Sequence, residues 1–302
     1  MRIMTWNMQG AGRGRDHSYK WTRLAGFLAS DGGTDVDAVA IQESGLLPRR
    51  LPGAHEVLAP HRGNGWDLEC FIWHPTPPAS ASASASTSVS AAAVGDDNTA
   101  LDDDAASDDE SDATSSEGSG GDAPIPRGSY HVVFIRFHYG TQPESRTNLA
   151  IVSRQRPLGI TNTVANWRSL IGIKVSDGHR NIWLHCMHAK VFGGDAMELV
   201  IQAMDAHSRD SHLLVGDFNR PPDARDLLDT TMVNAACGRP MRLIHPNDYT
   251  WTGQDSSGTP IAKILDYGLA VGDTGFVEAF TEDMDCSDHS AVVFQQAPRP
   301  RR

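Results

Sequence analysis

Short apolar segments with the length of a β-strand recur along almost the whole chain, and they restrict its fold more than any other feature. Turn residues separate these segments, which is the pattern of packed strands. Two longer stretches, 18–30 and 194–208, carry apolar residues at helical spacing, and a short third helix is expected near Asp223. Strands are predicted at 2–7, 37–43, 55–59, 67–73, 130–138, 147–153, 158–164, 169–175, 181–188, 212–217, 249–252, 264–271, 276–280 and 289–295. This arrangement predicts an α/β fold of two packed β-sheets flanked by helices.

The segment 78–127 interrupts the strand pattern. It contains Ser-Ala repeats, a Gly-Ser stretch and eleven acidic residues against one basic residue. Such a composition cannot bury enough apolar surface to offset the entropy of an ordered chain, so we expect a disordered insertion between two strands. The expected organisation is one domain over 1–297, interrupted by this insertion, followed by a tail at 298–302.

The acidic charge of the chain is concentrated in the same segment. The net charge is −12, of which 78–127 carries −10, so the other residues carry only −2 and can present local positive patches to an anionic substrate. Hydrophobic residues make up 39% of the 302 residues, which is enough for a buried core. No apolar stretch reaches the roughly 20 residues of a transmembrane helix, and the first residues lack a signal-peptide pattern. The four cysteines have no C-x-x-C spacing, which disfavours zinc and favours buried thiols, with a disulfide left open.

Polar residues gather where five of the predicted strands begin or end. The five stretches are Thr5-Trp6-Asn7, Ile41-Gln42-Glu43, His185-Cys186-Met187-His188, Gly216-Asp217-Phe218-Asn219 and Ser287-Asp288-His289. Loops at one edge of a sheet sandwich bring together residues that are distant in sequence. We therefore expect these side chains to form one site, although each stretch alone is also typical of an ordinary turn.

The side chains in these stretches suit the hydrolysis of a phosphodiester. Glu43 follows a strand and offers the oxygen ligand that Mg²⁺ prefers. Asp217 could orient and deprotonate an attacking water, and Asn219 could hold that water or a phosphate oxygen. His188 and His289 could stabilise the developing negative charge or act as general acids.

Three further residues could support this chemistry. Asp266 lies at the end of Ile264-Leu265-Asp266 and could orient the second nitrogen of a catalytic histidine. Arg146 and Arg168 each precede an apolar strand, where a guanidinium group could bind phosphate through paired N–H groups. Surface arginines are common, so this assignment depends on the other candidate site residues lying nearby.

Together these stretches resemble the motifs of the endonuclease/exonuclease/phosphatase superfamily. More narrowly, the chain resembles the nuclease (B) subunits of cytolethal distending toxins. The matching segments are Trp6-Asn7-Met8-Gln9-Gly10, Gln42-Glu43-Ser44-Gly45, Arg146-Thr147-Asn148-Leu149-Ala150-Ile151-Val152-Ser153-Arg154, His188-Ala189, Gly193-Gly194-Asp195-Ala196 and Gly216-Asp217-Phe218-Asn219-Arg220-Pro221-Pro222-Asp223. The resemblance covers the chain except for about 78–127, and it implies a DNase I-like four-layer α/β sandwich.

The resemblance also implies a role for each site residue. Glu43 would bind Mg²⁺, with Asn7 and Asp288 in or next to the shell of metal and water. Mn²⁺ or Ca²⁺ could also support the activity. The catalytic set would be His188, Asp217, Asn219, Asp266 and His289, and the phosphate-binding set would be Arg146, Arg168 and Asn219. The resemblance further implies DNA backbone phosphates as the substrate, toxin delivery subunits as partners, and secretion followed by action in a host nucleus.

Two other interpretations stay open at this point. Relatives with the same catalytic set hydrolyse phosphoinositide headgroups, and the motifs do not separate the two substrates because both present a phosphate. A catalytically silent binding module is the second alternative. The complete set of acidic and histidine residues argues against it, since a binding module has no chemical need for all of them.

Overall fold

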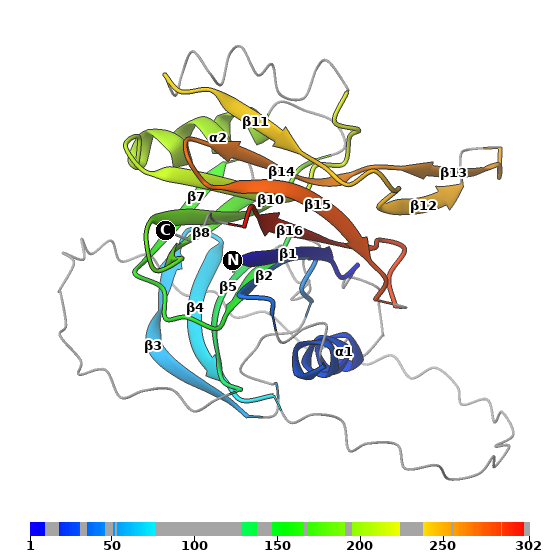
Figure 1. Ribbon diagram of the computed structural model, residues 1–302. Helices are drawn as coiled ribbons and strands as arrows, with labels where there is room; N and C mark the ends of the chain where they lie inside the picture. The colour runs from blue at the N-terminus through cyan, green and yellow to red at the C-terminus, as the bar shows by residue number, and fades with distance from the viewer. Residues whose placement is uncertain are drawn as a thin grey trace, which may run out of the picture. The chain divides into compact units, whose positions relative to one another are not determined.

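The computed structural model describes residues 1–9, 18–30, 35–45, 51, 53–75, 128–137, 147–165, 168–190, 195–223, 238–254, 257–284 and 286–298 (Figure 1). Four sequence-based expectations fall outside these residues. They concern the insertion at 78–127, Arg146, the short helix beyond Asp223 and most of the tail at 298–302.

The larger sheet has eight strands in the order β15-β16-β1-β2-β6-β5-β4-β3. Its strands are β1 (Arg2–Asn7), β2 (Ala38–Gln42), β3 (Ala54–Gly63), β4 (Trp66–Trp73), β5 (Tyr130–Phe137), β6 (Leu149–Ser153), β15 (Phe276–Glu282) and β16 (Ala291–Gln296). Neighbours are antiparallel except β1 and β2, which are parallel. The parallel pair places the last residues of both strands, Asn7 and Gln42, directly opposite each other.

The smaller sheet has six strands in the order β11-β14-β10-β9-β8-β7. Its strands are β7 (Gly159–Ala165), β8 (Arg168–Ser176), β9 (Asn181–His188), β10 (Ser211–Asp217), β11 (Met241–Ile244) and β14 (Asp266–Val271). Only β9 and β10 are parallel. A separate two-stranded hairpin consists of β12 (Trp251–Gln254) and β13 (Pro260–Lys263), and Figure 1 shows it beyond the ends of the two large sheets.

Alternating apolar residues on the strands divide the interior into three hydrophobic clusters. The central cluster lies between the two sheets and includes Ile151 from the larger sheet and Leu213 from the smaller one. Helix α1 (Ser18–Ala29) covers the outer face of the larger sheet through residues such as Trp21. Helix α2 (Asp195–Ala206) covers the outer face of the smaller sheet through residues such as Leu199. The order helix, sheet, sheet, helix confirms the predicted four-layer α/β sandwich.

The described elements agree with most of the predicted ones. Apart from β3, which extends to Gly63, the predicted strand boundaries lie within about two residues of the observed ones. Two strands, β11 and β13, are missed because each has only four residues and proline lies beside or within it, which argues against a strand in the sequence. Neither described helix is long and apolar enough to cross a membrane.

Candidate active site

The predicted site residues lie at matching ends of four strands. Asn7 ends β1, His188 ends β9 and Asp217 ends β10, while Asp266 begins β14. The strand register aligns them, because Asp217 is paired with His188 on one side and with Asp266 on the other. Glu43 directly follows β2. The topology of both sheets therefore brings these residues to one edge of the sandwich.

Contacts between the two sheets join the residues into one cluster. The side-chain amide Nδ2 of Asn7 donates a 2.8 Å hydrogen bond to Oδ2 of Asp217. Nε2 of His188 lies 3.8 Å from Oε1 of Glu43 and 3.7 Å from Oδ2 of Asp217. All four side chains are buried. The cluster thus spans the sandwich, with Asn7 and Glu43 from the larger sheet and His188 and Asp217 from the smaller.

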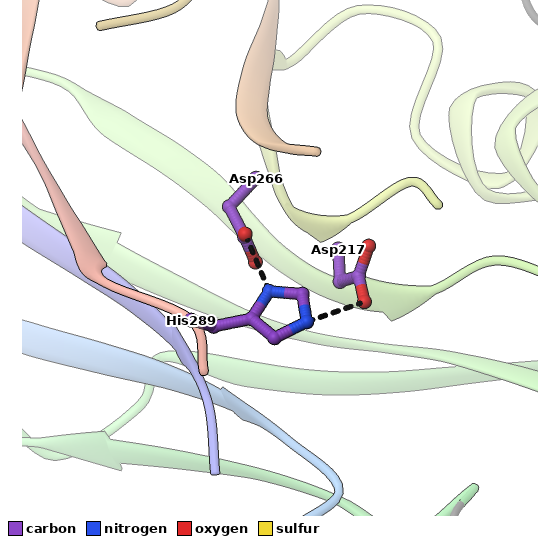
Figure 2. Close-up of side chains that lie close together, drawn as sticks. All are labelled: Asp217, Asp266 and His289. Atoms are coloured by element: carbon purple, nitrogen blue, oxygen red, sulfur yellow. Dashed lines mark hydrogen bonds and ion pairs between the residues drawn. The ribbon is translucent and has the colours of Figure 1, made fainter. Parts of the chain in front are cut away.

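His289 lies between two carboxylates (Figure 2). Its Nδ1 is hydrogen-bonded to Oδ2 of Asp266 at 2.8 Å, and its Nε2 lies 3.9 Å from Oδ2 of Asp217. Asp266 is completely buried, and His289 is 6% exposed. The Asp266 contact fixes the orientation of the imidazole ring, so that Nε2 points toward the centre of the cluster.

Asp288, next to His289 in sequence, lies at the edge of the cluster. Its Oδ2 accepts hydrogen bonds from Gln9 Nε2 at 2.7 Å and from Trp251 Nε1 at 3.1 Å. Its Oδ1 lies 3.8 Å from Nε2 of His289 and is buried without a hydrogen-bond partner in the described part of the chain. Ser287 anchors this loop, because its hydroxyl donates to the carbonyl of Asn7 at 2.8 Å.

The backbone around Asp217 has an unusual conformation that positions Asn219. Gly216 has a φ of 153°, and a Cβ there would lie 1.9 Å from the carbonyl oxygen of Met187, so only glycine fits. Asn219 donates its backbone N–H to Oδ1 of Asp217 at 2.7 Å and its side-chain amide to the carbonyl of Ala189 at 2.8 Å.

Three described residues other than glycine have a positive φ, and all three belong to this site. They are Gln9 at 50°, Glu43 at 48° and Asn219 at 55°. Such conformations cost free energy and persist only where the surrounding structure enforces them, which occurs often at functional sites. Their concentration here indicates that the fold holds these three side chains in fixed directions.

The electrostatics of the cluster favour proton transfer near neutral pH. Burial, together with the negative charge of Asp266, raises the pKa of Asp217 to about 7. Burial alone would lower the pKa of His289, but the charge and hydrogen bond of Asp266 outweigh it, with Asp217 and Asp288 adding to the effect, so the pKa rises to about 9. A carboxylate that titrates near neutrality and a histidine that stays protonated are suited to act as base and acid, respectively.

The cluster also has the chemistry of a cation site. One ligand atom each from Asp217, Asp266 and His289 lies within 4.8 Å of the others. Buried oxygen atoms of Asp266 (Oδ1) and Asp288 (Oδ1) have no hydrogen-bond partner among the described residues. Carboxylate oxygens that are concentrated and incompletely paired are the ligands that Mg²⁺ prefers, so the residues present fit a divalent cation.

One of the two predicted arginines is described. Arg168 begins β8, and its Nη1 donates a 3.4 Å hydrogen bond to the carbonyl oxygen of His188. Its guanidinium group therefore lies beside the strand end that carries a predicted catalytic histidine. Arg146 lies outside the described residues.

Sequence reasoning missed three residues that contact the site. Gln9 and Trp251 bind the carboxylate of Asp288. The hydroxyl of Thr250 accepts hydrogen bonds from the backbone N–H groups of Leu265 (2.8 Å) and Asp266 (3.0 Å). The only signal in the sequence was weak, because a threonine and a tryptophan at the start of a strand are typical of ordinary packing.

Comparison with known proteins supports the fold. No protein-family model matches the sequence, and no curated protein matches it. The chain is similar to the solved cytolethal distending toxin of Haemophilus ducreyi, with 20% identity, a TM-score of 0.60 and 98% coverage of both chains. For the toxin of Actinobacillus actinomycetemcomitans the identity is 20% and the TM-score 0.61, over 98% of this chain and 97% of that one.

A structure from the wider superfamily also matches. It is an endonuclease/exonuclease/phosphatase family protein from Leptotrichia buccalis, with 13% identity, a TM-score of 0.50 and coverage of 98% of this chain and 99% of that one. At these identities the likeness is one of fold. It confirms the DNase I-like sandwich, and it confirms the resemblance to the toxin subunits at the level of fold.

Proposed function

We propose that this chain is a divalent-metal-dependent phosphodiesterase that cleaves DNA. The observation that carries the proposal is the buried contact of Asp266 with His289 and of His289 with Asp217, at an edge that also holds Glu43 and His188. Two solved structures similar in fold support it. One is described as the biologically active subunit of cytolethal distending toxin (TM-score 0.59), the other as an endonuclease domain (TM-score 0.50).

Glu43, Asp288 and Asn7 are the residues that would hold the metal ion. The metal is Mg²⁺ in this proposal, with Mn²⁺ or Ca²⁺ as possible substitutes, and when bound it supplies positive charge that polarises the oxygens of the phosphate. We assign Asp217, Asp266 and His289 to proton transfer instead, although their ligand atoms also cluster. The reason is that His289 lies between Asp266 and Asp217, hydrogen-bonded to one and 3.9 Å from the other, an arrangement suited to moving a proton.

Asp217 is the residue that orients and deprotonates the attacking water. Hydrogen bonds from Asn7 and from the backbone of Asn219 fix both of its oxygens. A pKa of about 7 lets the carboxylate accept a proton at neutral pH. Asn219 holds the water or a phosphate oxygen from its own fixed position.

His188 and His289 are the residues that face the negative charge developing on phosphate. His289 has a raised pKa of about 9 and is protonated at neutral pH, so its Nε2–H can donate to a phosphate oxygen or to the leaving group. Arg168 and Arg146 complete the set by binding phosphate oxygens, as the guanidinium group does well. Such contacts read no base, so we expect little sequence preference.

The substrate class can be tested by comparing two phosphoesters. Purified protein with Mg²⁺ is incubated with supercoiled plasmid, and in parallel with a phosphoinositide whose phosphate release is measured. We expect nicking of the plasmid and little release of phosphate. Release of phosphate without nicking, with Mg²⁺ or Mn²⁺ present, would replace the nuclease by a phosphoinositide phosphatase that uses the same site.

Delivery is a separate part of the proposal. Partner subunits that carry the chain out of the producing cell and into a host nucleus are proposed on the resemblance to toxin subunits alone. Two experiments test this part independently of catalysis. One is co-purification with candidate delivery subunits, and the other is a cell-entry assay run with and without those subunits.

A further inference from the structure

The carboxylate of Asp288 is held asymmetrically. Two donors, Gln9 Nε2 at 2.7 Å and Trp251 Nε1 at 3.1 Å, both bind its Oδ2. The other oxygen, Oδ1, is buried, faces Nε2 of His289 at 3.8 Å and has no hydrogen-bond partner in the described residues. One oxygen is therefore occupied from two sides, and the other is presented to the centre of the cluster.

The hairpin β12–β13 places the indole of Trp251 at this carboxylate. Trp251 forms an isolated bridge with His289, and the backbone N–H of Thr252 donates to the carbonyl of Asp288 at 3.2 Å. Gly253 makes room for the ring, because a Cβ at this position would lie 2.3 Å from Cζ2 of Trp251. The direction of the indole N–H is thus fixed by backbone contacts on both sides.

The residue before this hairpin, Thr250, contacts the segment that carries Asp266. Thr250 accepts the backbone N–H groups of Leu265 and Asp266 with its hydroxyl, and its carbonyl accepts the N–H of Ser290 at 2.8 Å. Thr250 therefore contacts both the segment that carries Asp266 and the segment that carries His289.

Gln9 makes the matching connection from the larger sheet. Its backbone N–H donates to Oδ1 of Asn7 at 2.8 Å, and its side chain binds Asp288. Its φ of 50° is in the left-handed region, two residues after the end of β1. Gln9 therefore links a residue of the inter-sheet cluster to the carboxylate at its edge.

We propose that Trp251 and Gln9 are positioning residues that orient the carboxylate of Asp288 so that Oδ1 receives the divalent cation. The inference rests on the proposed function, because it assigns a cation to this oxygen. Residues that hold a metal-binding carboxylate in place commonly change metal affinity or activity about 10- to 100-fold when they are replaced. Neither residue contacts the phosphate in this assignment.

Two substitutions test the inference from different elements. Trp251→Phe removes the indole N–H and keeps an aromatic ring, and Gln9→Met keeps the length of the side chain without its donor. Binding of Mn²⁺ alone, measured by electron paramagnetic resonance without substrate, should weaken about 10-fold or more in each variant. The concentration of Mn²⁺ that half-activates hydrolysis should rise in parallel, whereas KM for the phosphodiester should stay unchanged.

Trp183→Phe is the matched control. The indole N–H of Trp183 donates to Oδ2 of Asp210 at 2.9 Å, so this variant removes the same kind of hydrogen bond away from the site. Its Mn²⁺ binding and kcat should equal those of the wild type. In an Asp288→Asn background, Trp251→Phe should have no further effect on Mn²⁺ binding, because the two residues act through one oxygen.

The outcomes separate this inference from the proposed function. If wild type binds Mn²⁺ and cleaves DNA while both variants bind Mn²⁺ equally well, the positioning role is wrong and the function stands. A rise in KM with unchanged Mn²⁺ binding also overturns the role, because it would place Trp251 against the substrate. A wild type that neither binds Mn²⁺ nor cleaves overturns both.

Discussion

At the scale of single residues, Asp217 connects the two halves of the proposed site. It accepts a hydrogen bond from Asn7 of the larger sheet, and its own strand pairs with those of His188 and Asp266. The sequence around each residue does not reveal these contacts, since Asn7 and Asp217 are 210 positions apart. What the sequence does carry is the residue type at each strand end, and the roles assigned to these residues stay predictions.

Replacement of either histidine tests its proposed role. We expect His188→Ala and His289→Ala each to lower kcat for a small chromogenic phosphodiester about 10²- to 10⁴-fold, because each removes a group that faces the phosphate. Thermal unfolding should still be cooperative. His179→Ala changes an exposed histidine in a turn and should keep full activity. A histidine variant that retains more than about a tenth of wild-type turnover would contradict the assignment.

At the scale of elements, the neighbouring strands β9 and β10 carry a second pair of histidines, His185 and His212. Nε2 of His185 lies 3.0 Å from Nδ1 of His212, and Nε2 of His212 lies 3.0 Å from the carbonyl of His207. Burial lowers the pKa of His185 well below its ordinary value and that of His212 to about 4. Gly172 provides the space, because a Cβ there would lie 2.6 Å from Nδ1 of His185.

This pair should make the fold sensitive to acid. In the unfolded chain His212 takes up a proton near pH 6.5, whereas in the folded chain it does so only near pH 4. Its contribution to the free energy of unfolding is therefore complete above pH 6.5 and is lost as the pH falls toward 4. Between about pH 7.5 and pH 5, His212 alone should lower the free energy of unfolding by about 2 kcal/mol. Urea unfolding at both pH values measures it, and His212→Gln should reduce the difference, whereas His61→Gln should not. Equal pH dependence in wild type and His212→Gln would show that the pair titrates normally.

The elements also show where sequence reasoning stops. Long strands such as β9 and both helices were predicted within about two residues, because their apolar periodicity is local. The four-residue strands β11 and β13 were missed, since proline and their short length outweigh that signal. Trp251 and Gln9 could not be predicted as partners of Asp288, because only the assembled fold brings the three segments together.

At the scale of the whole molecule, the acidic charge is concentrated in one stretch of the sequence, 78–127. The one-domain organisation over 1–297 with an inserted 78–127 is a proposal from composition, since residues 76–127 lie outside the described chain. The elements that carry the site belong to one compact unit, Met1–Pro78 with Arg127–Arg302. Of the net charge of −12, the residues outside 78–127 carry only −2.

Deletion of residues 79–123 tests this organisation. The deletion removes eleven acidic residues and few large apolar ones, so the unfolding temperature and hydrolysis of a small phosphodiester should stay nearly unchanged. Cleavage of DNA should become modestly faster at low salt and not at high salt, where charges beyond about 8 to 10 Å are screened. Loss of cooperative unfolding in the deletion variant would show that the segment is part of the folded core.

The dependence of plasmid nicking on Mg²⁺ tests the central claim most directly, namely that the strand ends form a metal-assisted phosphodiesterase site. Wild type should nick supercoiled plasmid only with Mg²⁺ and lose this activity in EDTA. Glu43→Gln should require about 10-fold more Mg²⁺ for half-maximal nicking, whereas Glu198→Gln, on the exposed face of α2, should behave as wild type. Nicking that continues in EDTA, or that is equally sensitive to Mg²⁺ in the Glu43 variant, would contradict the account.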